Sequence, residues 1–275
     1  MVRATFLGVS TLLFDDGDTA LLTDGFFSRP GLLRVVGRPL RPDPVRISAG
    51  LRRAGIADLA AVLVAHSHYD HALDAPAVAQ RTGALLVGSP STRQIALGHG
   101  LPADRFVPAP VASPLRIGSF TVTAVTSLHS HPDRFPGTID APVTIPARAG
   151  RYRTGECYSF HIGHSTGSLL VHASANFRPG ALADVRADTV FLGIGQLGRA
   201  DDGFRSSYWD EVVVAVRPRR VVPIHWDNLT RPLTPRVRPI PWPLDNHRRT
   251  MAWLKTACAD AGFELLMPTP WEPFL

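Results

Sequence analysis

The sequence predicts an α/β fold in which two β-rich layers carry helices on their outer sides. Two observations lead to this expectation. Short apolar runs separated by turn residues come first in each half of the chain, as in an antiparallel meander. Each half then changes to alternating strand and helix patterns, as in βαβ units. No segment has the composition of a linker, so we expect a single domain over residues 1–275.

The first half opens with the runs ATFLG, STLLF and TALLTD within residues 1–25. Residues 26–46 are rich in Pro, Gly and Arg and predict a loop. A short helix is expected over 47–54, because Gly55 follows it. The apolar run 59–65 predicts a buried strand. The remaining elements expected in this half are a helix over 75–81, a strand over 84–88 and a helix that begins at Ser89-Pro90-Ser91.

The second half begins with a hairpin whose second strand covers residues 120–127. Residues 130–155 form the longest irregular stretch, and a loop of this length in a compact domain is usually functional or disordered. The elements expected after it are strands over 157–163 and 168–174, a strand over 189–194, a helix over 206–216, a strand over 219–224, a Pro-rich loop to 243, a helix over 245–261 and a strand over 263–267.

The most informative segment is AHSHYDHA, which follows the predicted strand 59–65. Extended chain has a period of two, so His66 and His68 project to the same side and can reach one ion. Asp70 and His71 follow in a loop and can face a second ion or orient a water molecule. A single histidine at a strand end is usually a satisfied polar residue. Three histidines within six positions, with an aspartate among them, predict a metal site instead.

The run H-S-H-Y-D-H resembles the H-x-H-x-D-H motif of the metallo-β-lactamase superfamily. The resemblance covers roughly residues 4–228. His129 in TSLH and His225 in VPIHWDN lie where the superfamily has its later histidines, and Asp24 in LLTDG resembles its structural aspartate. The branch that ends in I-H-W, which includes an ascorbate-phosphate lactonase and an N-acyl-phosphatidylethanolamine phospholipase D, is the most similar. The resemblance implies a four-layer αββα sandwich.

The superfamily pattern also implies a ligand set and a reaction. It places His66, His68 and His129 on one metal ion, and Asp70, His71 and His225 on a second. Zinc is the expected metal, with manganese or iron as alternatives. The implied activity is hydrolysis of a small ester, lactone or phosphodiester by a metal-bound water or hydroxide, which Asp70 orients or deprotonates. A nuclease of the same superfamily, or a metal-binding protein with little catalysis, are the alternatives.

One residue departs from the superfamily pattern. Members with two metals usually carry a bridging aspartate in a G-D turn after the strand pair, and this chain has Ser174 and Ala175 there. An alanine cannot bridge cations, so the second site should be weaker. Three outcomes stay open: one tightly held metal with Asp70 free as a base, two metals bridged by hydroxide alone, or a substitute ligand. His131 and His172 are the candidates for a substitute ligand, and the alternative interpretation, which is favoured for each, is a loop or core histidine. The other histidines are expected to be structural or on the surface: His99, His161, His164 and His247.

The substrate pocket is expected to lie between segments that converge on the strand ends. These are Phe26 and Phe27, the 130–155 loop and the 226–243 stretch, and their apolar content favours a substrate with an apolar part. Arginines in the long loop either meet a phosphate or carboxylate or form a solvated face. They are Arg134, Arg148, Arg151 and Arg153.

Composition limits the other classes of function. The apolar fraction of 45% and charged fraction of 19% are ordinary for a soluble protein. We find no secretion signal and no apolar run of about 18 residues, so no transmembrane segment is expected. Cys157 and Cys258 are too few for a disulfide framework, which favours the cytoplasm. The net charge of +6 comes from scattered arginines without a recognition motif, so a small-molecule substrate is expected and nucleic acid is not. The oligomeric state stays open.

Overall fold

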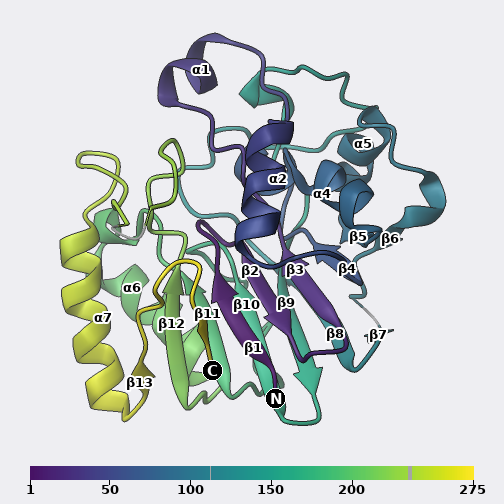
Figure 1. The fold of residues 1–275 in the computed structure, drawn as a ribbon. Helices are drawn as coiled ribbons and strands as arrows, with labels where there is room; N and C mark the ends of the chain where they lie inside the picture. The colour runs from purple at the N-terminus through teal and green to yellow at the C-terminus, as the bar shows by residue number, and fades with distance from the viewer. Residues whose placement is uncertain (112, 235–236) are drawn as a thin grey trace.

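The computed structural model describes residues 1–111, 113–234 and 237–275, and these residues form two seven-stranded sheets (Figure 1). From edge to edge, the first sheet contains β14 (Pro273–Phe274), β1 (Arg3–Phe6), β2 (Leu12–Asp15), β3 (Ala20–Thr23), β4 (Ala61–Leu63), β5 (Leu85–Gly88) and β6 (Phe106–Pro108). The second contains β13 (Glu264–Leu265), β12 (Arg220–Ile224), β11 (Thr189–Gly193), β10 (Gly167–His172), β9 (Cys157–His164), β8 (Phe120–Ser127) and β7 (Leu115–Ile117).

The helices lie at the two outer sides of the sheet pair, with α2, α4 and α5 over one sheet and α6 and α7 over the other (Figure 1). They are α1 (Leu32–Gly37), α2 (Pro44–Arg53), α3 (Tyr69–Ala72), α4 (Ala75–Thr82), α5 (Pro90–Gly98), α6 (Asp202–Trp209) and α7 (His247–Ala261). A π-helical turn, η4 (Asp210–Val214), continues α6, and short 3₁₀ turns occur as η1 (Ala103–Arg105), η2 (Ala149–Arg151) and η3 (Leu197–Arg199). None of the described helices is long and apolar enough to cross a membrane.

Three apolar clusters account for the layers. Successive residues of a strand point to opposite faces, so Leu21 of β3 packs in the cluster between the sheets while Leu22 packs under the helices. In β11, Phe191 likewise faces the other sheet, and Val190 and Leu192 face α6 and α7. Both faces of each sheet are therefore buried, and the predicted four-layer αββα sandwich with two mixed sheets is confirmed.

Strand direction brings polar segments to one edge of the sandwich. β3, β4 and β5 run parallel in the first sheet, so their carboxyl ends lie at the same edge. Asp24 directly follows β3, and the segment 64–71 follows β4. In the second sheet, β8 leads into His129 and β12 leads into His225. The candidate ligand residues of both sheets therefore lie near the same edge of the sandwich.

The structure corrects several element boundaries. The expected loop 26–46 contains α1 and the start of α2, which begins at Pro44 because Asp43 caps it through bonds to two backbone N–H groups. The helix predicted over 206–216 begins at Asp202, and its last part is π-helical. The helix predicted from 245 begins at His247, after an Asn246 cap. β6 and α3 had not been predicted.

Candidate metal centre

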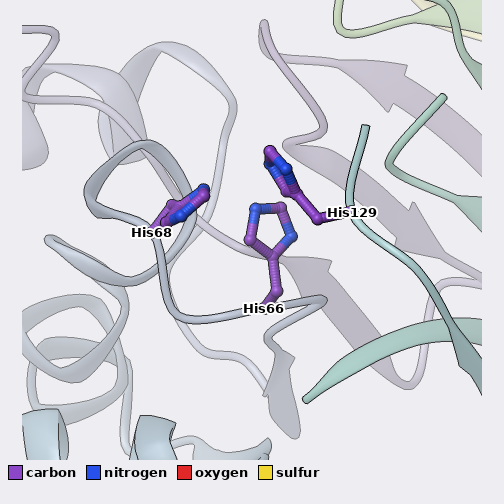
Figure 2. Close-up of side chains that lie close together, drawn as sticks. All are labelled: His66, His68 and His129. Atoms are coloured by element: carbon purple, nitrogen blue, oxygen red, sulfur yellow. The ribbon is translucent and has the colours of Figure 1, made fainter. Parts of the chain in front are cut away.

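The first group of histidines lies where β4 and β8 end. Figure 2 shows the imidazoles of His66, His68 and His129 turned toward one another. Their ring centroids are 4.9 Å apart for His66 and His68, 4.8 Å for His66 and His129, and 4.4 Å for His68 and His129. One ring nitrogen from each lies within 4.8 Å of the others. We call these three residues the first triad.

The second group combines α3 with the end of β12. Asp70 and His71 were predicted in a loop, but they lie in the single turn of α3, and both are buried. The Nε2 atom of His71 lies 3.1 Å from Nε2 of His225, and Asp70 Oδ2 lies 3.6 and 3.4 Å from these two nitrogens. We call Asp70, His71 and His225 the second triad.

These separations suit a divalent cation. Tetrahedral ligands at about 2.0 to 2.1 Å from zinc are about 3.3 to 3.4 Å from one another, and the second triad has separations of 3.1 to 3.6 Å. In the first triad, His66 Nε2 and His129 Nδ1 are buried and have no hydrogen-bond partner among the described residues. A buried polar atom without a partner is costly unless something binds it. Both triads therefore fit a metal ion.

The two triads adjoin each other and each draws on both sheets. The rings of His66, from the first triad, and His71, from the second, have centroids 3.8 Å apart, so the two triads lie side by side. The first triad takes two residues from the segment after β4 and His129 from the end of β8. The second takes two residues from α3 and His225 from the end of β12. The site therefore bridges the junction of the sheets.

A buried carboxylate fixes the ring of His71. Nδ1 of His71 lies 2.8 Å from Asp24 Oδ2, and Asp24 also accepts hydrogen bonds from Ser10 Oγ at 2.6 Å and from the Ala65 backbone N–H at 2.9 Å. The Nδ1–H group therefore donates to Asp24, which leaves the lone pair of Nε2 directed at the site. Burial lowers the pKa of His71, but Asp24 and Asp70 outweigh it, so the pKa is raised and the ring is a stronger electron-pair donor.

His68 has partners of its own. Its Nε2 atom lies 3.0 Å from Thr154 Oγ1 and 3.3 Å from Asp133 Oδ1. Thr154 Oγ1 in turn contacts the other oxygen of Asp133 and the backbone oxygen of Phe135. With the hydroxyl hydrogen directed to one of these oxygens, Thr154 and Asp133 accept from His68 Nε2–H, and Nδ1 is left with its lone pair for an ion.

His225 is held in an uncommon backbone conformation. Its φ is 58°, in the left-handed region that β-carbon-bearing residues rarely adopt. Its backbone N–H donates to Val9 O at 2.7 Å, and the Val9 N–H donates to Asp227 Oδ1 at 2.8 Å. Asp227 also forms an ion pair with Arg29, whose side chain is only 5% exposed and donates to two backbone oxygens after β12. These contacts hold His225 in its strained backbone conformation.

Burial dominates the electrostatics of the first triad. Burial lowers the pKa of His66 well below its usual value, with nearby His71 acting in the same direction. Burial also lowers the pKa of His129 to about 3. Neutral imidazole is the form that binds metal ions. For Asp70, burial raises the pKa, but His71 and His225 outweigh it and keep the carboxyl group ionised.

Ala175 follows β10, where the superfamily usually has its bridging acid. The two triads together contain a single carboxylate, that of Asp70. Of the two substitute ligands considered, His172 is buried, with Nδ1 bonded to Ser159 Oγ and Nε2 to Asn176 O, both at 2.7 Å. His131 is exposed and borders a separate hollow that Ala175 also lines. His172 thus belongs to the core, as the alternative interpretation had it.

Other side chains singled out in the sequence have partners outside the triads. His164 Nε2 lies 3.2 Å from Asp16, and His161 Nε2 lies 2.9 Å from the Arg186 backbone oxygen. His247 stacks on Trp226 with ring centroids 4.7 Å apart. The cysteines Cys157, on β9, and Cys258, on α7, are free and buried.

A cavity of about 580 Å³ opens onto both triads. The 130–155 loop and the stretch after His225 border it, as predicted, although residues 235 and 236 lie outside the described part of the chain. The prediction for Phe26 and Phe27 is wrong, because both are buried in the core under the helices. Side chains that border the cavity include Leu32, Val35, Val36, His68, Tyr69, Asp70, His129, Arg134, Phe135, Arg148, Gln196, His225, Leu229, Ile240, Pro241 and Leu244.

Two parts of the cavity wall had not been predicted. They are α1 and the turn at Gly195 and Gln196 after β11. The apolar residues of α1 could have indicated a binding surface, since they lie in an otherwise polar segment. Of the four loop arginines, Arg134 and Arg148 border the cavity, and the structure places the other two outside its lining.

An αββα sandwich with histidine and aspartate triads at the junction of its sheets defines the metallo-β-lactamase class of fold. Residues 19–226 match the family described as Beta-lactamase superfamily domain, and the chain belongs to this family. The solved metallo-beta-lactamase fold protein YhfI from Bacillus subtilis has a similar fold, with a TM-score of 0.60, 16% sequence identity, and coverage of 99% of this chain and 98% of that chain.

Curated relatives are similar over shorter stretches. A protein from Christiangramia forsetii is 36% identical over 90 residues, 32% of each chain, and one from Sinorhizobium medicae is 30% identical over 129 residues, 47% of this chain and 48% of its own. Both are named UPF0173 metal-dependent hydrolase. The chain thus spans about a third to a half of the length of these relatives.

Proposed function

We propose that this protein is a metal-dependent hydrolase of a small ester, lactone or phosphodiester. The first triad, His66, His68 and His129, would hold one divalent cation, and the second, Asp70, His71 and His225, would hold another. Zinc is the preferred ion, because five of the six ligands are imidazoles. The observation that carries the proposal is that both triads, each with ligand atoms within 4.8 Å of one another, border one cavity.

A divalent cation bound here would supply Lewis-acid polarisation of the scissile carbonyl or phosphoryl group and a lowered pKa for water. Residues of the chain itself would orient the ligand nitrogen atoms and the water molecule. Asp24 holds the Nε2 atom of His71 toward the site, and Thr154 with Asp133 does the same for Nδ1 of His68. Asp70 lines the cavity as an ionised carboxylate, so its free oxygen can accept a hydrogen bond from the attacking water and orient it.

A resemblance to one branch of the superfamily indicates which reactions should be tested first. The I-H-W sequence at 224–226 resembles the branch of lactonases and phospholipase D enzymes, which favours lactones and phosphodiesters over β-lactams. Trp226 itself is buried in the apolar cluster under α6 and α7, stacks on His247 and does not border the cavity, so its role here is packing rather than substrate contact.

The proposal is tested by metal content and turnover together. The protein is purified without added metal, its zinc, manganese and iron are measured, and a panel of chromogenic lactones, esters and bis-aryl phosphodiesters is assayed before and after chelation. Asp70→Asn should lower kcat/KM at least about a hundredfold, whereas Asp140→Asn on the exposed part of the 130–155 loop should not. Absence of chelator-sensitive turnover on every substrate would overturn the proposal.

A metal-binding protein with little catalysis is the second candidate, and Ala175 is the observation that favours it. Without a carboxylate after β10, two neighbouring cations lack a shared negative charge to offset their repulsion. Tight binding of one ion per chain with no turnover would favour this second candidate. Two anomalous-scattering peaks about 3.5 to 4 Å apart in a crystal would favour the hydrolase.

A further inference from the structure

We propose that the substrate is an anionic amphiphile, with an apolar arm of about six to ten carbons that lies against α1 and the described apolar residues after His225, and an acidic group near Arg134 and Arg148. This inference rests on the proposed function for its hydrolysable bond, which would lie at the triads. The class of ligand follows separately from the walls of the cavity.

The first wall is α1, a six-residue helix with no buried residue. Its apolar side chains Leu32, Val35 and Val36 border the cavity, and Leu32 and Val36 are 56% and 74% exposed. Val35 packs against the core under the helices and so attaches α1 to the body of the protein. Exposed apolar side chains gathered in one place are typical of a binding surface.

A second part of the wall comes from described residues after His225. Leu229, Ile240, Pro241 and Leu244 border the same cavity, and Leu244 is 40% exposed. Phe135 contributes a further apolar surface beside His68, with ring centroids 6.1 Å apart. The apolar walls therefore extend from the triads to α1. A volume of about 580 Å³ is within the range of pockets for small molecules and admits an arm of this length.

The charges on the cavity wall favour an anion. Apart from the histidines, the charged side chains of the lining are Asp70, at the triads, and Arg134 and Arg148. Within the part of the chain that the structure describes, neither arginine has an ion pair with a carboxylate. Guanidinium groups bind carboxylate and phosphate through paired N–H donors. Two unpaired arginines on an apolar cavity thus complement an amphiphile that carries one acidic group.

Binding of inert amphiphiles to the zinc-loaded protein tests this inference by calorimetry. Octanoate should bind more tightly than butyrate by about fourfold for each methylene that the apolar walls cover. Leu32→Ser should weaken octanoate binding roughly three- to tenfold. Its neighbour Leu33 is 90% exposed and does not border the cavity, so Leu33→Ser is the matched control and should bind like wild type. Both leucines are exposed, so both variants should fold.

The acidic group is tested with a second matched pair. Arg148→Gln should weaken octanoate about two- to fivefold, as for an exposed ion pair, and leave 1-octanol unchanged. Arg151→Gln, in the same loop but outside the cavity lining, is the control. Equal affinities for butyrate and octanoate, or equal effects of Leu32→Ser and Leu33→Ser, would overturn the inference even if hydrolysis is observed. Chain-length-dependent binding without turnover would uphold it while the proposed hydrolase fails.

Discussion

Replacement of Asp24 by asparagine should weaken metal binding at the second triad. The side chain is fully buried and accepts three hydrogen bonds, from His71, Ser10 and Ala65. An asparagine amide group facing His71 Nδ1 is a donor, so it favours the tautomer that has its hydrogen on Nε2 and blocks the ligand atom. Loss of such a partner typically lowers metal affinity 10- to 100-fold, which is about 1.4 to 2.7 kcal/mol.

The assay is competition with a chromophoric chelator at neutral pH, together with urea unfolding to confirm that the variant is folded. Asp74→Asn is the control, because Asp74 is also fully buried and accepts three hydrogen bonds, from Phe27 N and from the N–H and hydroxyl groups of Ser28. Among the described residues, the Asp74 carboxylate bonds to Phe27 and Ser28 and to no triad nitrogen, so its variant should keep wild-type metal affinity. A folded Asp24→Asn protein that binds metal as wild type does would refute this reasoning.

Three further predictions concern the surroundings of the site. Asp227→Ala leaves the guanidinium of Arg29 buried without its partner, so the free energy of unfolding should fall by about 3 to 5 kcal/mol in urea titration; a loss below about 1 kcal/mol would contradict this. Gly195→Ala should reduce metal affinity, measured with the chelator, because the new Cβ would lie 2.5 Å from His225 O. Burial raises the pKa of Asp74 to about 6 from 3.8, against opposing hydrogen bonds from Ser28, so the folded protein holds this proton more tightly than the unfolded chain. Its contribution of about 3 kcal/mol should be full below about pH 4, fall as the pH rises through 6, and be absent from the pH profile of Asp74→Asn.

Local patterns in the sequence were sufficient to predict the layers and to select four of the six candidate ligands. Near-continuous apolar runs such as 20–23 and 189–193 indicate strands buried on both faces. His66, His68, Asp70 and His71 are close in sequence, so their proximity in space needed no knowledge of the fold. His129 and His225 could be assigned only through the resemblance to a known superfamily, since nothing local distinguishes them from other strand-end histidines.

The residues that orient the ligands could not be predicted, because their pairings depend on the packed fold. Asp227 and Arg29 are 198 positions apart, and Thr154 and His68 are 86 positions apart. The sequence gives no distance for such pairs. α1 was missed for a different reason, since six residues between a Gly and a Pro-rich stretch are too few to give helical periodicity. Phe26 and Phe27 were placed in the pocket because burial by α2 and α4 cannot be read locally.

Each triad contains residues from both sheets, so any cation bound there would also cross-link the two halves of the sandwich. Binding to the folded state alone adds free energy that grows with the logarithm of metal concentration, by about 2.7 kcal/mol at a hundredfold excess over Kd. The melting temperature of this protein would then rise with the concentration of the free metal ion that it binds. Removal of metal should first loosen the rim where the sheets meet and leave the opposite rim, near both chain termini, intact (Figure 1).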